Sequence, residues 1–273
     1  MNLNLKNRTV LITGGSRGVG KAIARAFVAE GARVVICGRD AESLRKAREE
    51  LCGVENSCSK TIFTCVLDAT KSEEAMALFS PLGLISAIGS LDVLVNNVGG
   101  AESFGGFCDL KDRDWIRAYE LNFMSAVYFS REALPWLQKS GNGRIINISS
   151  VPARQPGGYN PHYSAAKAAL LNLSKHLANQ LGQYNILVNA ICPSTLRGGG
   201  WDTNVKKRAL REGISEEEAA RKTEETDKKK NPLSRLGTLE DVANLVVFLA
   251  SPVANFITGT CIDVDGGTVR SIV

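Results

Sequence analysis

The chain has 273 residues, of which 44% are hydrophobic and 22% are charged, and it contains 26 glycines. This composition is typical of a globular protein with a substantial core, and it excludes an intrinsically disordered, collagen-like or small disulfide-rich chain. The net charge of +5 comes from basic and acidic residues that are spread evenly, so it suits an anionic ligand but does not indicate a nucleic-acid partner.

Residues 1–13 pass from a polar stretch into one apolar strand, without the charged region and long apolar run of a secretory signal. Every apolar stretch is interrupted before it reaches about 18 residues, the length of a membrane span. We therefore expect a cytoplasmic protein that makes no membrane contact. The cysteines are scattered and lack the histidine partners of a metal site, so we expect reduced thiols and no bound metal.

Seven short β-branched runs alternate with longer segments of helical periodicity. The helical segments begin near residues 18, 40, 72, 111, 163 and 238. Strand and helix repeated in this order predict a single domain, residues 1–273, with a doubly wound α/β fold of the Rossmann type. Its sheet is parallel, helices cover both faces, and ligands bind at the carboxyl ends of the strands. The expected strands are 9–12, 34–37, 61–67, 93–95, 144–148, 186–191 and 261–264.

The turn after the first strand has the sequence Thr-Gly-Gly-Ser-Arg-Gly-Val-Gly at residues 13–20. Residues without a β-carbon allow a tight turn and close approach of the backbone to a phosphate, and the helix that follows points free N–H groups at the anion. A glycine-rich turn without function is the alternative, but the position between a strand and a helix favours a dinucleotide site. The expected contacts to the cofactor are Gly14, Ser16, Arg17, Gly18, Val19 and Gly20.

The end of the second strand indicates which dinucleotide is bound. An acidic residue at this place accepts hydrogen bonds from a ribose 2′-hydroxyl and repels a 2′-phosphate. Here Gly38 holds the place and Arg39 follows, and Arg39 together with Arg17 can pair with a 2′-phosphate. Asp40 is expected to cap the next helix. The residues favour NADP(H), with NAD(H) as the alternative.

The next helical segment begins at Ser72 and contains Pro81 and Gly83, which should break or kink it.

A tyrosine and a lysine are placed for acid/base chemistry. Tyr163 and Lys167 are four residues apart on an expected helix, so both side chains project from one face. A neighbouring ammonium stabilises a phenolate, which allows proton exchange nearer to neutral pH than the usual tyrosine pKa of about 10. Such a pair alone is common on helix surfaces. Ser150 follows the strand 144–149, and Ser149 should point to the opposite face.

These motifs together resemble the short-chain dehydrogenase/reductase family, and the resemblance extends from Thr9 to Gly267. The glycine spacing after Thr13 is one element, and Asn-Asn-Val-Gly at 96–99 is similar to the family's Asn-Asn-Ala-Gly. The resemblance implies that Asp68 and Ala69 read the adenine. It also places Asn96 and Gly99 at the cofactor.

The resemblance further implies the catalytic set. Hydride passes between the nicotinamide C4 and a carbonyl or carbinol carbon, Ser150 holds the carbonyl oxygen, and Tyr163 moves the proton. Lys167 also holds the nicotinamide ribose, and Asn122 joins Lys167 through water in a proton relay. The alternative for Asn122 is an amide that bonds a backbone carbonyl inside a helix.

The sequence departs from the family pattern after the sixth strand. The usual Pro-Gly is replaced by Pro193-Ser194, so Pro193 and Thr195 are the candidate contacts to the nicotinamide carboxamide, with Thr195 as a substitute for the family's threonine. His162, beside Tyr163, is a second candidate acid/base group, but a flanking histidine more often packs or faces solvent.

The segment 194–230 looks inserted. It contains a glycine run at 198–200 and a capping box of Ser215 with Glu218, so part of it is expected to be helical. Its balanced charges favour a solvated helical face. The functional interpretation is a mobile lid over the substrate.

The C-terminal motifs at 231–237 and 256–267 resemble the subgroup that contains 3-oxoacyl-carrier-protein reductases and sugar or polyol dehydrogenases, which implies a homotetramer. The leading hypothesis is an NADP(H)-dependent oxidoreductase that acts on a small-molecule ketone or secondary alcohol. One alternative is an NAD-linked sugar or polyol dehydrogenase. The other is a catalytically silent protein that senses NADP(H).

Overall fold

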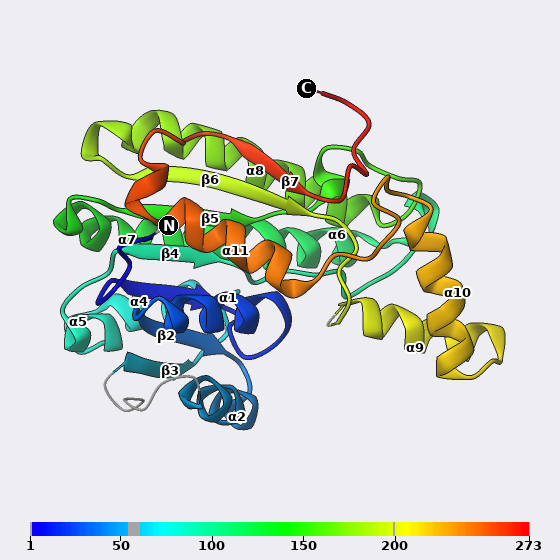
Figure 1. The fold of residues 1–273 in the computed structure, drawn as a ribbon, viewed down its shortest axis with the longest axis horizontal. Coiled ribbons are helices and arrows are strands. Elements are labelled where there is room, and N and C mark those ends of the chain that lie inside the picture. Colours follow the sequence, from blue (N-terminus) through cyan, green and yellow to red (C-terminus); the bar gives the residue numbers. More distant parts are fainter. Residues whose placement is uncertain (1, 54–60, 199, 273) are drawn as a thin grey trace.

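A computed structural model describes residues 2–53, 61–198 and 200–272. Seven parallel strands form one sheet in the order β3-β2-β1-β4-β5-β6-β7 (Figure 1). The doubly wound α/β fold and all seven expected strands are confirmed. The strands are β1 (Thr9–Thr13), β2 (Arg33–Gly38), β3 (Ile62–Val66), β4 (Val93–Asn96), β5 (Arg144–Ile148), β6 (Leu187–Pro193) and β7 (Cys261–Val264).

Helices cover both faces because successive strand side chains point in opposite directions. Val10 and Ile12 of β1 pack into one core with residues of three helices, while Leu11 between them packs into the other core. The first face carries α1 (Gly18–Ala29), α2 (Ala41–Cys52) and α11 (Leu239–Ala250). The second face carries α4 (Ser72–Phe79), α5 (Leu84–Ile88), α7 (Ser125–Ser140) and α8 (Pro161–Leu181).

The strand order reverses between β1 and β4, and this reversal positions the site. The chain leaves β1 toward β2 on one side and returns from β4 toward β5 on the other. The connections therefore diverge at the carboxyl ends of β1 and β4 and leave a crevice, which is where doubly wound sheets bind ligands.

Two helical segments are interrupted, and the sequence predicted only the first interruption. Helix α4 ends at Phe79 and α5 begins at Leu84, so the expected break around Pro81 and Gly83 is confirmed. The helix α6 (Asp112–Tyr119) runs into the π-helical segment η2 (Glu120–Met124), which leads directly into α7.

The segment 194–230 forms α9 (Gly200–Glu212) and α10 (Glu216–Lys228), which lie beyond the carboxyl ends of the strands (Figure 1). Trp201, Val205 and Ala219 are buried in a small separate core. The Ser215 hydroxyl accepts a hydrogen bond from the Glu218 N–H at 3.1 Å, as expected of an N-cap. The second hydrogen bond of the expected capping box, from the Ser215 N–H to the Glu218 carboxylate, does not form. The Glu218 carboxylate instead pairs with Lys222, at 2.9 Å.

The short segments η1 (Phe107–Asp109), η3 (Val151–Ala153), η4 (Gly182–Tyr184) and η5 (Pro252–Ala254) complete the described structure. Among the described residues, no helix is both long and apolar enough to cross a bilayer. The expectation that all cysteines are reduced is wrong for Cys52, which is disulfide-bonded. Cys58 lies outside the described residues. The other cysteines are free thiols: Cys37, Cys65, Cys108, Cys192 and Cys261.

Phe129 tests the second core. It is fully buried on α7 and meets Phe79 edge to face, with ring centroids 6.3 Å apart. Phe129→Ala should lower the free energy of unfolding by about 3–5 kcal/mol, because it removes apolar contacts and leaves a cavity. Urea denaturation followed by circular dichroism measures the change. The control Met76→Ala, on exposed surface of α4, should change it by less than about 0.5 kcal/mol; equal effects would contradict the packing described.

Candidate active site

The turn between β1 and α1 is shaped for close approach of a ligand. Gly14 and Gly18 have φ values of +67° and +54°, in the left-handed region that favours glycine. A β-carbon on Gly20 would lie 2.3 Å from the Gly14 carbonyl oxygen, so only glycine fits there. Helix α1 has no side-chain cap and no acidic residue in its first turn, so its N–H groups are available to an anion. Ser16 and Arg17 lie in the same turn, and Val19 is the second residue of α1.

The end of β4 is fastened to this turn. The Thr13 hydroxyl accepts hydrogen bonds from the N–H groups of Asn97 and Val98, at 2.9 and 3.1 Å. The Asn97 amide donates to the carbonyls of Thr13 and Gly14, at 2.9 and 3.1 Å. The structure therefore brings Asn97 to the glycine turn. The Asn96 side chain points into the protein interior instead, where it donates to Asn147 and to Ser130.

The end of β2 presents an exposed guanidinium. Arg39 and Arg17 are both solvent-exposed, and the described residues place no carboxylate in an ion pair with either. Asp40 caps α2, because its carboxylate accepts a hydrogen bond from the Ser43 N–H at 2.8 Å. This confirms the expected role of Asp40 and leaves Arg39 as the charged group beside Gly38.

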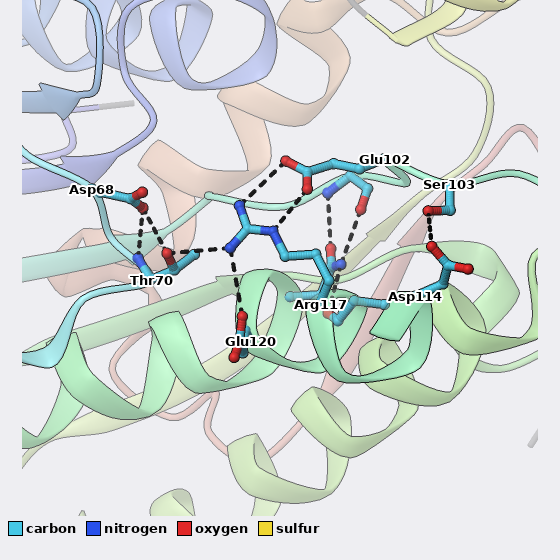
Figure 2. A network of polar contacts seen from close by, with 10 residues as sticks. Asp68, Thr70, Glu102, Ser103, Asp114, Arg117 and Glu120 are labelled. Atoms are coloured by element: carbon cyan, nitrogen blue, oxygen red, sulfur yellow. Dashed lines mark hydrogen bonds and ion pairs between the residues drawn. The ribbon is translucent and has the colours of Figure 1, made fainter. Parts of the chain in front are cut away.

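The turn after β3 is linked to the loop after β4 by one arginine (Figure 2). Asp68 accepts hydrogen bonds from the N–H and hydroxyl of Thr70, at 3.0 and 2.8 Å. Arg117 of α6 reaches Thr70 at 3.4 Å and Glu102 at 2.8 Å. Burial raises the pKa of Asp68, but the Thr70 hydrogen bonds and the charges of Arg39 and Arg117 outweigh it and hold this pKa below its usual value. Ala69 is buried beside Asp68.

Ser150 and Tyr163 lie together at the carboxyl end of β5. Ser150 precedes η3, which packs against α8, and this places Ser150 near Tyr163. Burial raises the pKa of Tyr163, and the nearby Ser150 hydroxyl opposes that rise. The Ser149 hydroxyl donates to the Lys167 backbone carbonyl at 3.0 Å, so the two serines point apart, as the strand alternation predicts.

Lys167 is a buried cation with only 2% of its surface exposed. Its ammonium donates to the Ile148 carbonyl at 2.8 Å. Burial lowers the pKa of Lys167 to about 8, although the neighbouring Cys192 opposes the shift. A β-carbon on Gly99 would lie 2.6 Å from the Lys167 Nζ, so the absence of a side chain at Gly99 keeps space open beside the ammonium.

Asn122 flanks the same space from the π-helical segment. Its amide donates to the carbonyls of Gly100 and Ala118, both at 2.9 Å, and its Oδ1 accepts from the Gly100 N–H at 2.8 Å. The side chain is thus engaged with backbone, which is the alternative that the sequence left open. The same Oδ1 would lie 2.7 Å from a β-carbon on Gly99, so Asn122 and Lys167 both border this glycine.

The remaining candidate residues take different places. β6 ends at Pro193, and the Thr195 carbonyl accepts a hydrogen bond from Gly237 at 3.1 Å. His162 is buried and meets the Trp115 ring edge to face at 6.1 Å, which confirms the packing interpretation. Burial lowers the pKa of His162, and Asp114 opposes the shift.

The comparisons with known proteins agree with this geometry. A family model described as enoyl-(acyl carrier protein) reductase matches residues 14–269. The chain is similar to the uncharacterized oxidoreductase YvrD of Bacillus subtilis (strain 168), with 36% identity over 272 residues that cover 100% of both chains. It is similar to 7alpha-hydroxysteroid dehydrogenase of Escherichia coli (strain K12), with 33% identity over 99% of this chain and 98% of the relative. L-Sorbose reductase from Gluconobacter frateurii, solved in complex with NADPH and L-sorbose, matches with a TM-score of 0.91 and 30% identity over 100% of both chains.

The chain belongs to the short-chain dehydrogenase/reductase family. The resemblance carried by the sequence motifs is therefore confirmed. As a member of this family the protein is an oxidoreductase that acts on CH–OH and C=O groups.

The sequence analysis of this short-chain dehydrogenase/reductase did not identify two residues that the structure places at the site, Arg117 and Asn97. Arg117 lies on the exposed side of a helical pattern, where an arginine is unremarkable, and only the fold brings Glu102 and Thr70 to it. Asn97 follows Asn96 directly, and the strand alternation could have assigned the inward and outward side chains. The period-2 pattern of β4 is the signal that would have found it.

Lys167 makes stability depend on pH above neutrality. The pKa is about 8 in the folded chain, against 10.5 for an unperturbed lysine. Between these values the unfolded chain binds more protons, so the free energy of unfolding should rise with pH, by at most about 1.4 kcal/mol per pH unit. Below about pH 8 both states are protonated and this contribution to the slope vanishes.

Urea denaturation of the wild type and Lys167→Met over this pH range measures the contribution. Between about pH 8 and 10.5, the free energy of unfolding of Lys167→Met should increase less with pH than that of the wild type. Lys175→Met, at an exposed position on the same helix, should keep the wild-type profile. A profile that Lys167→Met leaves unchanged would contradict a lowered pKa.

Proposed function

We propose that the protein is an NADP(H)-dependent oxidoreductase that interconverts a small-molecule ketone and a secondary alcohol, with Tyr163 as the general acid/base. The observation that carries the proposal is the convergence of Ser150, Tyr163 and the buried Lys167 at the end of β5. A surface Tyr-x-x-x-Lys pair would not bury its ammonium, because burial of a charge is costly.

The residues present fit a nicotinamide dinucleotide. The glycine turn excludes β-carbons where a pyrophosphate would approach, and the uncapped start of α1 offers N–H groups to it. Arg39 and Arg17 would hold the 2′-phosphate, Asp68 and Ala69 the adenine, and Gly99 the central part of the cofactor. The Asn96 side chain is bonded inside the protein and is not available for this contact. Pro193 and Thr195 would contact the nicotinamide end. When bound, NADP(H) supplies or accepts the hydride at its nicotinamide C4.

The chain's own residues move the proton. Ser150 orients the substrate oxygen, and the hydroxyl of Tyr163 gives its proton to that oxygen during reduction or takes one from the alcohol during oxidation. The Lys167 ammonium stabilises the phenolate that reduction leaves behind, because an opposite charge favours the ionised form. Asn122 would hold a water molecule that connects Lys167 to solvent. Through this water, Tyr163 would regain its proton after reduction.

Other candidates have weaker support. An NAD-linked sugar or polyol dehydrogenase would share the fold, but Gly38 and Arg39 stand where such a protein needs an acidic residue. The relative solved with NADPH and L-sorbose supports the NADP(H) assignment and keeps sugars among the substrates to be screened. A silent sensor of NADP(H) would have no use for the buried lysine beside Tyr163.

The proposal extends to organisation. We propose one domain with residues 194–230 as a substrate lid, in a cytoplasmic homotetramer that acts on small molecules and not on nucleic acid or membranes. The lid has contacts on which to settle: the Lys207 ammonium lies 3.4 Å from the ring centroid of Phe104, in the loop after β4. Gly198, with a φ of +95°, lies within the lid segment, before α9.

Tyr163→Phe tests the general acid/base. The variant should lose about 10²- to 10⁴-fold in kcat, because no hydroxyl remains to exchange the proton. NADPH binding, measured by fluorescence titration, should be retained. Tyr184→Phe, at an exposed position far along the chain, serves as the control and should keep full activity in the same carbonyl screen. Turnover that survives in Tyr163→Phe would remove Tyr163 from the role.

Arg39→Ala tests the choice of cofactor. Loss of a charge-assisted contact to the 2′-phosphate should lower kcat/KM for NADPH by about 10- to 100-fold, while kcat/KM for NADH changes little. Arg131→Ala, on the exposed face of α7, is the matched control and should leave both values unchanged. A wild-type protein that prefers NADH would overturn the assignment.

A further inference from the structure

Two cysteines meet on the last two strands of the sheet: Cys192 lies near the carboxyl end of β6, and Cys261 is the first residue of β7. Cys192 of β6 is in register with Asp263 of β7, and Cys261 lies two residues before Asp263, so the two thiols share one face of the sheet. Their sulfur atoms are 3.2 Å apart, and both cysteines are free. A disulfide bond is about 2.05 Å long, so the sulfurs must approach by about 1 Å. Cys261 is in register with Ala190 and is therefore diagonal to Cys192, so bond formation also requires the backbones of β6 and β7 to shift toward each other.

The pair is chemically unequal. Cys192 is fully buried, whereas Cys261 is partly exposed. Their shared hydrogen bond lowers the pKa of Cys261 and, together with burial, raises the pKa of Cys192. Cys261 is therefore the thiol that ionises first and that a small oxidant can reach.

Cys192 lies near the proposed catalytic set. Cys192 is close enough to Ser149 for that hydroxyl to lower the Cys192 pKa, and the Ser149 hydroxyl donates to the Lys167 backbone carbonyl at 3.0 Å. Cys192 is also close enough to influence the pKa of Tyr163 and of Lys167. The residue after Cys192 is Pro193, where β6 ends. Movement of this sulfur toward β7 would thus disturb both the backbone behind Lys167 and the expected nicotinamide contact.

The same side chains suit a metal less well. Cys192, Cys261 and Asp263 offer three ligand atoms within 4.8 Å of one another. However, the Asp263 carboxylate is paired with Arg154, and the Lys167 ammonium adjoins Cys192. Two positive charges at the cluster oppose a bound cation.

We propose that Cys192 and Cys261 form a reversible disulfide when a peroxide oxidises them, and that the disulfide slows the reaction at the adjoining site. The Cys261 thiolate attacks one oxygen of the peroxide, the O–O bond breaks, and Cys261 becomes a sulfenic acid while hydroxide leaves. The Cys192 sulfur then attacks the sulfenic sulfur; the S–S bond forms, the S–O bond breaks, and the Cys192 proton leaves in water. Two thiols are oxidised and one hydrogen peroxide is reduced to two waters.

Peptide mapping of the full-length protein tests the disulfide without reference to activity. After treatment with hydrogen peroxide and alkylation of the remaining thiols, mass spectrometry should detect the peptides of Cys192 and Cys261 joined, and dithiothreitol should separate them. Cys65→Ser is the control and should give the same linkage. Alkylation of both cysteines as separate thiols after peroxide, or protection of both by added Zn²⁺ with stoichiometric binding of the metal, would overturn the proposal.

The effect on turnover rests on the proposed function, and it is measured separately as NADPH oxidation in the presence of a carbonyl substrate. Peroxide should lower the activity of the wild type and of Cys65→Ser, and dithiothreitol should restore it. Cys261→Ser should lack this reversible loss, and because it keeps the disulfide-bonded Cys52, it also separates the contribution of that residue. Linkage without any loss of activity would overturn the regulatory part alone, and a protein without NADPH turnover would overturn the proposed function while the linkage stands.

Discussion

The buried ammonium of Lys167 is the constraint around which the site is organised. A charge placed away from water is unfavourable unless dipoles or an opposite charge compensate for it. Among the described residues no carboxylate forms an ion pair with Lys167, and its ammonium donates instead to the carbonyl of Ile148. The pKa of Lys167 is lowered because this compensation is incomplete. An ionised Tyr163 nearby would supply the missing negative charge. The buried ammonium therefore favours the phenolate form of Tyr163, which is the form that accepts a proton in the proposed reaction.

The backbone around this charge is as specific as the side chains. Gly99 leaves room between the Lys167 ammonium and the Asn122 amide, and the Asn122 side chain fixes the Gly100 backbone through a pair of hydrogen bonds. Asn122 reaches that position from a π-helical segment, a geometry that is frequent at functional sites because it displaces residues from the regular helical register. The helix that continues as α7 packs Phe129 into the core, so the irregular segment is held by regular structure on its C-terminal side.

Much of this arrangement is readable from the sequence because it depends on local pattern. The period-2 strands and the helical segments between them predict the sheet, and residue spacing alone places Tyr163 and Lys167 on one face of α8. The break at Pro81 and Gly83 and the cap at Asp40 follow from backbone chemistry. Contacts between distant segments are different. Neither the pairing of Cys192 with Cys261 nor the link from Arg117 to Glu102 has a local signal, because each depends on the register of neighbouring strands or on where a loop crosses a helix.

The Arg117 network shows how such distant contacts couple parts of the site. Arg117 joins the turn at Thr70, where the adenine is proposed to bind, to Glu102 in the loop that carries Phe104. Phe104 in turn receives Lys207 of α9, so a chain of contacts runs from the turn after β3 to the proposed lid. Each single contact at the surface contributes little energy, since exposed ion pairs are typically worth less than about 1 kcal/mol. Together these contacts fix the position of the loop after β4, because Arg117 links it to the turn at Thr70 and Lys207 links it to the proposed lid. An ordered turn at Thr70 therefore favours the loop conformation in which Phe104 contacts Lys207.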